Sequence, residues 1–600
     1  MTDLLARIRA SCLRFVLVLV VAGCSEAAGI GPSAPTPDAS DDAPTTDAGT
    51  GEDGGLINHD GGACEPSCSP DLRRVVDCKG DTLEQCGADR GCSPEAICVA
   101  ACAAADAQHS SIGCEFFTHA PDLWFNSWGS CYGVSLTNVW ASPAELKAAY
   151  GTTSLDVKQI AYVPKISSQG VEYEPLLGPL PPGQTAVLFL AQYKSGASAR
   201  TPCPPGVNVA VSDEDVAPHE TRIATAFRLQ SSVPAVAYSF APIGAENSTA
   251  GVASAIASAS LLLPSASWGD NYLMITPAEL FSTSKYGDIY PWLSFIARED
   301  DTVVTVGAKV DVASGQGVAG IKAGAVGSYT LQRGEVLYLS KAMGLLGGAV
   351  QSSKPIAHFA GHGLLDGDAV HQQVLPISVL GSRYPLVPPR SRQTAKPDST
   401  RYRFVGVVDG TKIDFEPSRP ALALKAGEMV ELDTTEALVA SSQDLDHPFY
   451  VFEYMLKDAS GHNIGDGEFS SVIPVEQAQS RYSFFMEPSY QNSHLVVVRA
   501  RGASGFDPVA LDCLSSPLAF SPLGLGGQYE FARVDLVTAN APQGSCSAGL
   551  RTLSGDGGFV GRAWGWSQLG FENGVGVSYA FPVGLGTKPI NSVVVPPVPR

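Results

Sequence analysis

The chain has 600 residues and a formal net charge of −21 at pH 7, although only 16% of its residues are charged. Such an acidic chain has no basic patch to displace counterions from phosphates, so nucleic-acid binding is excluded. With 62 glycines and 43 prolines, the composition favours many short strands and turns over long helices.

The first 24 residues have the plan of an export signal. Arginines precede a short apolar run at residues 15–21, and Ala22 and Gly23 then precede Cys24. A membrane span needs about 20 apolar residues, so this run is typical of a secretion signal. The ending Val21-Ala22-Gly23-Cys24 resembles the bacterial lipobox, in which the cysteine is acylated and holds the mature protein to a membrane. The sequence therefore predicts a signal peptide at 1–23 and lipidation of Cys24. Because Ser25 rather than aspartate follows the cysteine, the expected location is the outer membrane or cell surface of a Gram-negative bacterium. An ordinary cleaved signal is the alternative.

Residues 24–63 are rich in Pro, Thr and Asp and contain no Lys or Arg. A segment with so few apolar residues cannot offset its ordering entropy and is predicted to be a disordered acidic linker. A calcium site is the alternative, but the acidic run lacks the regular ligand alternation of a calcium loop.

Cysteine spacing predicts a small disulfide-rich module at residues 64–102. Seven of the 14 cysteines lie in this segment, as expected for an exported module too small to be held by core packing. Zinc is the alternative, but paired C-x2-C knuckles and histidines are absent there. Proximity along the chain favours the pairs Cys114–Cys131 and Cys513–Cys546. The disulfide candidates are Cys64, Cys68, Cys78, Cys86, Cys92, Cys98, Cys102, Cys114, Cys131, Cys203, Cys513 and Cys546.

Residues 103–600 repeat one pattern of hairpins four times. Each copy has a strand–turn–strand segment, a glycine turn before an alternating strand, and a Ser-rich or Gly-rich start to a hydrophobic strand, which in three copies is marked by proline. The pattern predicts an all-β fold of tandem quasi-repeated β-sandwich-like units. A β-propeller-like fold is the alternative, although propeller blades are usually about 40–50 residues long. The sub-units are expected at about 103–265, 266–385, 386–480 and 481–600, with turn glycines Gly183, Gly334, Gly427 and Gly527.

The sequence motifs of common enzyme classes do not occur in this chain. It contains no G-x-S-x-G, H-E-x-x-H, P-loop or EF-hand pattern, so no enzymatic activity and no cofactor are predicted. The best metal candidates are His358, His362 and His371, near Asp366 and Asp368; four-residue spacing puts the first two imidazoles on one face of a strand. The alternative, which we favour, is that His358 lies in a core strand and the others cap a loop.

Two further groups of side chains carry weaker expectations. His219 and Glu220 lie in an acidic loop and are expected to be solvated. Trp564 and Trp566 are two apart on one strand and share a face, which is more often core than a sugar platform.

Several strings together resemble one known family. They include CYGVSLTNVW at 131–140, LLLPSASWGDNYLMIT at 261–276, SSKPIAHFAGH at 352–362, DHPFYVFEYM at 446–455 and PINSVVVPP at 589–597. The region 103–600 is similar to the IgGFc-binding protein N-terminal domain family, and in particular to myxobacterial lipoproteins that carry this domain behind a Cys-rich module.

The resemblance implies an extracellular β-rich binding or adhesion region with no catalytic residues to transfer. Family members often carry a cysteine pair in the loop that corresponds to residues 363–373, whereas this chain has none there. The expected function is therefore that of a surface-anchored binding or adhesion protein, whose partner is an unknown extracellular protein or glycan. A structural envelope or extracellular-matrix protein is the alternative, and a hydrolase with a cryptic site is a third.

We predict that Cys24→Ala releases the protein from the membrane fraction or leaves an unprocessed precursor, because the acylated thiol is lost. Cell fractionation and the mass of the processed chain measure this. Normal processing with unchanged fractionation would contradict lipidation.

Overall fold

The computed structural model describes residues 65–599 apart from 168–169, 194–200, 245–255, 280, 284–286, 393–396, 457–463 and 570–574. The predictions for the signal peptide, Cys24, the linker and Cys64 concern residues outside this range. All described residues belong to one unit, Leu56–Arg600. None of their helices is long and apolar enough to cross a membrane.

Disulfides hold the small N-terminal module together. Cys68 pairs with Cys92, Cys86 with Cys98, and Cys78 is also disulfide-bonded. The hydrophobic cluster of this module contains three buried residues, Val75, Cys86 and Cys92, so little apolar packing supports it. Its elements are β1 (Ser67–Cys68), β2 (Arg74–Val76), β3 (Thr82–Gln85), β4 (Arg90–Cys92), β5 (Cys98–Ala100) and the helix α1 (Ala101–Ala107).

The disulfide pairing predicted from proximity is half right. Cys513–Cys546 is present, but Cys114–Cys131 is wrong. Cys114 instead pairs with Cys102, which ties α1 to the first strand of the β region, and Cys131 pairs with Cys203 across a separation of 72 residues. Chain distance failed because Cys114 lies on β6 and Cys131 lies just before β7, and these two strands pair with different parts of β14.

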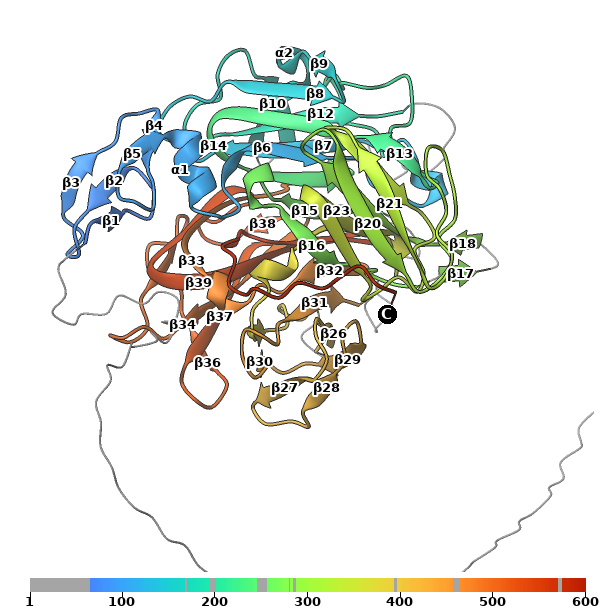
Figure 1. Ribbon diagram of the computed structural model, residues 1–600. Coiled ribbons are helices and arrows are strands. Elements are labelled where there is room, and N and C mark those ends of the chain that lie inside the picture. Colours follow the sequence, from blue (N-terminus) through green and yellow to red (C-terminus); the bar gives the residue numbers. More distant parts are fainter. Residues whose placement is uncertain are drawn as a thin grey trace, which may run out of the picture. The chain divides into compact units, whose positions relative to one another are not determined.

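The strand pairings of the β region follow one plan of seven core strands in four successive repeats, with further strands inserted. Figure 1 shows the strands in chain order, coloured from blue through green and yellow to red. In each copy the fifth, second, sixth and seventh strands pair in that order in one layer, and the first, sixth and third strands pair in the other. The prediction of tandem quasi-repeated sandwich-like units is confirmed, and the described strands form no propeller.

Repeat 1 carries the largest insertions. Its short helix and extra hairpin follow the fourth strand, and one extra strand pairs with repeat 2. Its elements are β6 (Gly113–Thr118), η1 (Phe125–Ser127), β7 (Tyr132–Asn138), β8 (Leu146–Tyr150), β9 (Thr153–Leu155), α2 (Val157–Ile160), β10 (Ala161–Ser167), β11 (Gly170–Pro175), β12 (Thr185–Ala191), β13 (Arg222–Thr225), β14 (Phe227–Ala241) and β15 (Ser258–Leu262).

Repeat 2 follows the plan with one small hairpin inserted before its second strand. Its elements are η2 (Ser265–Ser267), β16 (Gly269–Leu273), β17 (Phe281–Thr283), β18 (Gly287–Ile289), β19 (Pro291–Ala297), β20 (Thr302–Ala308), β21 (Ala325–Leu331), β22 (Glu335–Leu339), β23 (Ala349–Leu365) and β24 (Asp368–Val374).

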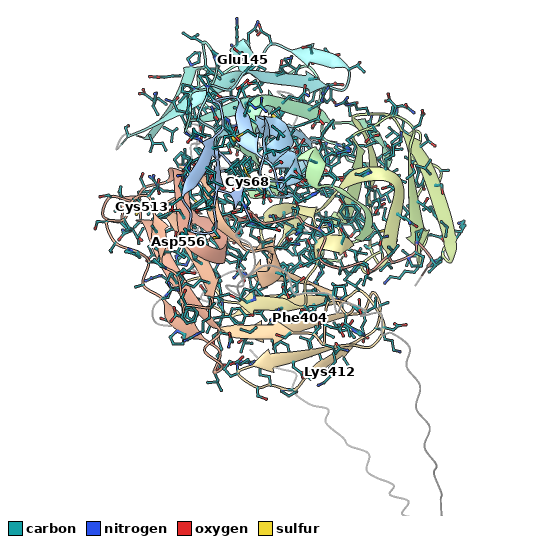
Figure 2. All side chains as sticks on the ribbon, turned by 60° about the vertical axis from the view of Figure 1, so that its left-hand side comes forward. Cys68, Glu145, Phe404, Lys412, Cys513 and Asp556 are labelled. Carbon is teal, nitrogen blue, oxygen red and sulfur yellow. A yellow bond between two sulfur atoms is a disulfide. The ribbon has the colours of Figure 1, made fainter. Side chains whose placement is uncertain are left out.

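Repeat 3 shows the sandwich most plainly, because its sixth strand is split between two four-stranded sheets around a separate hydrophobic core. Figure 2 labels Phe404 on one layer and Lys412 on the other. The elements are η3 (Ile377–Val379), β25 (Arg383–Leu386), β26 (Thr400–Gly406), β27 (Thr411–Glu416), β28 (Leu422–Leu424), β29 (Met429–Thr434), β30 (Leu438–Ser441), β31 (Phe449–Met455) and β32 (Glu468–Ser471).

Repeat 4 keeps the pairing of the plan with a very long sixth strand, on which Trp564 and Trp566 are buried in the core as predicted. Its elements are η4 (Val475–Gln477), β33 (Gln479–Met486), β34 (Asn492–Ala500), β35 (Val509–Leu511), β36 (Ser521–Leu523), β37 (Tyr529–Thr538), β38 (Ala541–Pro542), β39 (Gly549–Leu569) and β40 (Val575–Pro582).

The sixth strand passes from one layer of each sandwich to the other. In β14 and β23 the change of partners falls at Ser-Ser-x-Pro, where proline has no N–H to lose from the ladder. Ser231 donates its hydroxyl to the carbonyl of Val233 at 2.6 Å, and Ser352 donates to Lys354 at 2.7 Å. These hydroxyls satisfy carbonyls that the bent ladder leaves unpaired.

A buried tyrosine pins the first strand to the sixth in three repeats. Each hydroxyl accepts a backbone N–H three residues earlier and donates to a carbonyl of the sixth strand, in the manner of a tyrosine corner. For Tyr384 the two distances are 3.1 Å from Gly381 N and 2.6 Å to Phe449 O. Tyr272 and Tyr482 make the equivalent bonds, to Ile356 O at 2.6 Å and to Phe559 O at 2.8 Å.

The seventh strands of the four repeats, β15, β24, β32 and β40, meet one another. Here the Asp368 carboxylate accepts backbone N–H groups of Ala257 at 2.8 Å and Ser578 at 2.7 Å. The Gln372 amide donates to the carbonyls of Ala259 at 2.8 Å and Ala580 at 2.9 Å. One strand of repeat 2 therefore links repeats 1 and 4 through side-chain-to-backbone bonds.

We predict that Tyr384→Phe and Tyr482→Phe each lower the free energy of unfolding by about 1–3 kcal/mol, because each leaves a buried N–H and carbonyl without a partner. Chemical denaturation measures this. Tyr290→Phe is the matched control, since its hydroxyl donates to the exposed Asp288, and we expect a change below about 0.5 kcal/mol. If Tyr384→Phe and Tyr482→Phe both leave the stability unchanged, the hydrogen bonds of these hydroxyls do not hold the first strand to the sixth.

Candidate ligand-binding site

A pocket of about 410 Å³ lies where loops of repeats 1 and 2 meet. Repeat 1 contributes the loop before β7 and the loop before β13; repeat 2 contributes the segment before β19 and the loop after β22. The same two loop positions of successive repeats thus line one cavity. Its volume falls in the range of small-molecule sites, roughly 300–1,000 Å³.

Aromatic rings form the walls of this cavity, which we call the Trp128 pocket. Phe125 is 47% exposed and Trp128 is 36% exposed, whereas Trp292 is buried at 1%. The rings of Trp124 and Phe125 meet edge to face with centroids 5.2 Å apart. The Trp128 indole N–H donates to the carbonyl of Leu123 at 2.8 Å, which closes the loop on itself and fixes the ring.

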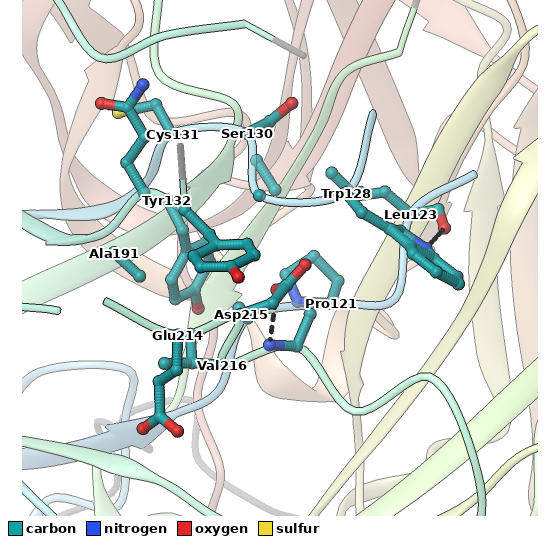
Figure 3. Close-up of a pocket in the computed structure, with 16 residues that line it drawn as sticks. Pro121, Leu123, Trp128, Ser130, Cys131, Tyr132, Ala191, Glu214, Asp215 and Val216 are labelled. Carbon is teal, nitrogen blue, oxygen red and sulfur yellow. Dashed lines mark hydrogen bonds between the residues drawn. The ribbon is translucent and has the colours of Figure 1, made fainter. Parts of the chain in front are cut away.

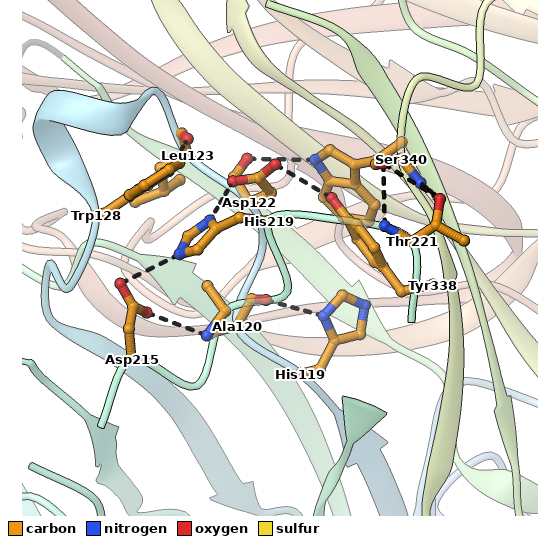
Figure 4. A network of polar contacts seen from close by, with 12 residues as sticks. His119, Ala120, Asp122, Leu123, Trp128, Asp215, His219, Thr221, Tyr338 and Ser340 are labelled. Atoms are coloured by element: carbon orange, nitrogen blue, oxygen red, sulfur yellow. Dashed lines mark hydrogen bonds and ion pairs between the residues drawn. The ribbon is translucent and has the colours of Figure 1, made fainter. Parts of the chain in front are cut away.

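His219 supports Trp128 from below (Figure 4). The two rings are stacked with centroids 3.7 Å apart. The imidazole Nδ1 lies 2.7 Å from Asp122 and Nε2 lies 3.3 Å from Asp215. Burial by itself lowers the pKa of His219, but the hydrogen bonds and charges of the two carboxylates raise that pKa to about 9. An imidazolium therefore lies beneath the indole at neutral pH, and the expectation that His219 is solvated was wrong; Glu220 is exposed as predicted.

Asp122 connects this support to the sheet of repeat 2. Its carboxylate accepts the Tyr338 hydroxyl at 3.3 Å, and its backbone carbonyl accepts the Trp292 indole N–H at 3.2 Å. Burial raises the pKa of Asp122, while the hydrogen bond and charge of His219 act against that rise. With carboxylates on both sides, His219 is the group of this cluster that holds the proton.

A second histidine, His119, lies deeper and has the opposite protonation state. Burial lowers its pKa to about 4, so the ring is neutral. Its Nδ1 donates to the Ala120 carbonyl at 2.9 Å, which leaves Nε2 to accept the Ser294 hydroxyl at 2.7 Å. This Ser–His contact has no carboxylate behind it, and Ser294 is fully buried, so it is not arranged for nucleophilic catalysis.

Behind Trp128 there is a void of about 20 Å³ (Figure 3). Tyr132, Glu214 and Asp215 line it, beside the Cys131–Cys203 disulfide. It is large enough for about one water molecule. The disulfide fixes the loop that carries Trp128 to the segment that leads to His219.

The outer rim of the Trp128 pocket carries both signs of charge. The Tyr290 hydroxyl donates to Asp288 at 3.1 Å, and the Lys341 ammonium lies 5.1 Å from the centre of the Tyr290 ring. Glu220 adds a further exposed carboxylate. The rim thus offers hydrogen-bond donors and acceptors around an aromatic floor.

The three candidate metal ligands are not brought together. The strand register puts His358 and His362 on one face and His371, opposite Gly361, on the other. All three are buried in β23 and β24, so the expectation that His362 and His371 cap a loop was wrong: residues 363–373 form a hairpin whose turn lies at Asp366 and Gly367. Across the part of the chain that the structure describes, no three His, Cys, Asp or Glu side chains could hold a metal ion.

Each of these histidines has a structural role instead. The His358 ring stacks on Phe295 with centroids 4.6 Å apart. His371 binds the hydroxyls of Ser239 at 2.9 Å and Ser258 at 3.0 Å in the region where the seventh strands meet. Burial lowers the pKa of His358 to about 4 and that of His371 to about 3, so both are neutral packing residues.

The comparisons with known proteins give one positive result. The sequence model described as IgGFc binding protein matches residues 258–565, about half of the 600-residue chain, from β15 to β39. No curated protein and no solved structure matches the chain.

We predict that the stability of the folded protein falls at alkaline pH because His219 loses its proton. Its folded pKa of about 9 lies above the usual value of 6.5, so its contribution is complete below pH 6.5 and is lost as pH rises through 9. This loss amounts to about 3 kcal/mol. Denaturation at pH 6 and pH 10 should show the fall in the natural protein and a smaller fall in His219→Gln; equal slopes would show that the imidazolium does not form.

Proposed function

The chain belongs to the IgGFc-binding protein family, and from this premise we propose that it is an extracellular binding protein whose ligand occupies the Trp128 pocket. Family membership supports an extracellular binding role, and the exposed rings of Phe125 and Trp128 on a rigid base are the observation that carries the choice of site. Exposed aromatic surface held by a scaffold is the usual anchor of a binding site.

We place the anchor at an acylated Cys24 and treat residues 24–63 as the tether that leads to the module at 64–102 and the β region at 103–600. In this proposal the protein is attached to the outer membrane and the pocket faces an extracellular protein or glycan. The acidic net charge of −21 supports a partner other than nucleic acid.

The side chains of the pocket support binding rather than catalysis. Asp122 and Asp215 are both engaged with His219, so neither is a free carboxylate beside a nucleophile. The Ser294–His119 contact is sealed beneath the pocket. A general acid or base must reach the reacting atom, and these groups are held as supports for the indole instead.

The test compares variants of the full processed chain in pull-down from whole cells, polysaccharides and secreted proteins. Phe125→Ala and Trp128→Ala should each weaken capture of the ligand about tenfold or more, since each removes a large exposed ring. Leu525→Ala is the matched control, because Leu525 is 82% exposed and lies far along the chain in repeat 4. Capture that is unchanged in both ring variants would place the ligand elsewhere.

A hydrolase screen on the same preparations tests the absence of catalysis. We expect no turnover. Turnover that His119→Gln or His219→Gln abolishes, with an unchanged melting temperature, would contradict a purely binding function.

A further inference from the structure

The charges around the Trp128 pocket restrict the kind of ligand it can take. His219 and Lys341 are cationic, and Asp122, Asp288 and Glu220 are acidic. An anionic ligand would approach three carboxylates, and a cationic ligand would approach an ammonium and an imidazolium. Desolvating like charges against each other is unfavourable, so the cavity favours a ligand without net charge.

Trp128 offers only one face to such a ligand. Its other face is covered by the His219 ring at 3.7 Å between centroids, which leaves 36% of the residue exposed. Phe125 presents a second exposed ring beside it. Flat apolar rings bind the C–H face of a sugar ring by apolar contact and by the attraction of C–H groups to the negative face of the ring.

Polar groups of the rim match the hydroxyl groups that such a ring carries at its edges. Asp288 and Glu220 can accept hydrogen bonds from hydroxyls, and Lys341 can donate to them. Glu220 and Lys341 are exposed at the solvent side of the cavity. The Asp288 carboxylate already accepts the hydroxyls of Ser282 and Tyr290, and its two oxygens have lone pairs left for a further hydroxyl. A neutral polyhydroxylated ligand can therefore use both signs of charge at once.

We propose that the Trp128 pocket binds a neutral saccharide, with one sugar ring lying on Trp128 or Phe125 and its hydroxyls bonded to Asp288, Glu220 and Lys341. This inference rests on the proposed function, because it assumes that the pocket is the binding site. A protein partner uses a broad interface of about 800 Å² on each side, whereas this site is a concave cavity of about 410 Å³.

The test is calorimetric titration of the full processed chain with neutral malto-, cello- and chito-oligosaccharides. Two charged sugars serve as comparisons: chitosan oligomers, which are the cationic counterpart of the chito-oligosaccharides, and oligogalacturonate, which is anionic. We expect at least one neutral series to bind, and its affinity to exceed that of both charged sugars by about tenfold or more. Equal or tighter binding of a charged sugar overturns the proposal.

Variants assign the binding to this pocket. Trp128→Ala, Phe125→Ala and Asp288→Asn should each weaken the neutral oligosaccharide by about tenfold or more, and Leu525→Ala should not. Trp128→Ala also removes the N–H that holds the Leu123 carbonyl. Phe125→Ala is therefore the decisive variant, provided that its melting temperature matches that of the natural protein.

The outcomes distinguish the proposal that the ligand is a saccharide from the proposal that the Trp128 pocket is the binding site. If Phe125→Ala loses capture of the ligand from cells, but no neutral oligosaccharide binds the natural protein, the pocket remains the binding site and the saccharide proposal is overturned. Oligosaccharide binding that survives Phe125→Ala and Trp128→Ala also overturns this proposal. Loss of both capture and oligosaccharide binding in the ring variants supports it.

Discussion

The meeting of the four seventh strands is the constraint on which the rest of the β region depends. A sandwich of about 100 residues could bury its core alone, but here β24 lies against β15, β32 and β40, and its polar side chains bond to the backbone of the other repeats. Asp368 is fully buried, and burial together with Asp466 and Glu468 raises its pKa well above the usual value. Such a group is tolerated because two backbone N–H donors face it, and those donors belong to different repeats. The relative position of repeats 1, 2 and 4 is thus coupled to the satisfaction of a single carboxyl group.

This coupling determines where binding residues can lie. Since the seventh strands are enclosed, a ligand cannot reach them, whereas the loops at the ends of the sandwiches are accessible. The segment between the first and second strands is short in repeat 4, with 5 residues, and has 13 or more residues in repeats 1, 2 and 3. In repeat 1 it carries Trp124, Phe125 and Trp128, and in repeat 2 it carries Asp288 and Tyr290. The pocket therefore arises where the two repeats with the most inserted residues are neighbours, joined by the pairing of β13 with β22.

Much of the fold was readable from the sequence, because the repeated hairpins and the buried Trp564 and Trp566 follow local rules of turn chemistry and alternation. The tyrosine clamp was missed, although its signal is present: Tyr272, Tyr384 and Tyr482 each follow a proline, at 264, 376 and 474, by eight residues. The Cys131–Cys203 bond and the burial of His362 and His371 could not be predicted, since both depend on contacts between distant segments. The pocket was missed for the same reason. Trp124 and Trp128, four residues apart outside any strand pattern, were its only local sign.

Two histidines show that the partners of a buried ring, rather than burial alone, decide its charge in this protein. His119 and His219 lie in the same network, yet one is neutral and the other charged, because His119 faces a carbonyl and a hydroxyl while His219 faces two carboxylates. The charged ring is also the one that stacks on an exposed indole. The positive charge of the imidazolium is attracted to the negative face of the Trp128 indole. This attraction fixes the orientation of the indole before a ligand binds. A preorganised aromatic surface loses little conformational entropy when a ligand binds. The titratable side chains beneath the rings are therefore best understood as groups that hold the rings in place and do not transfer protons.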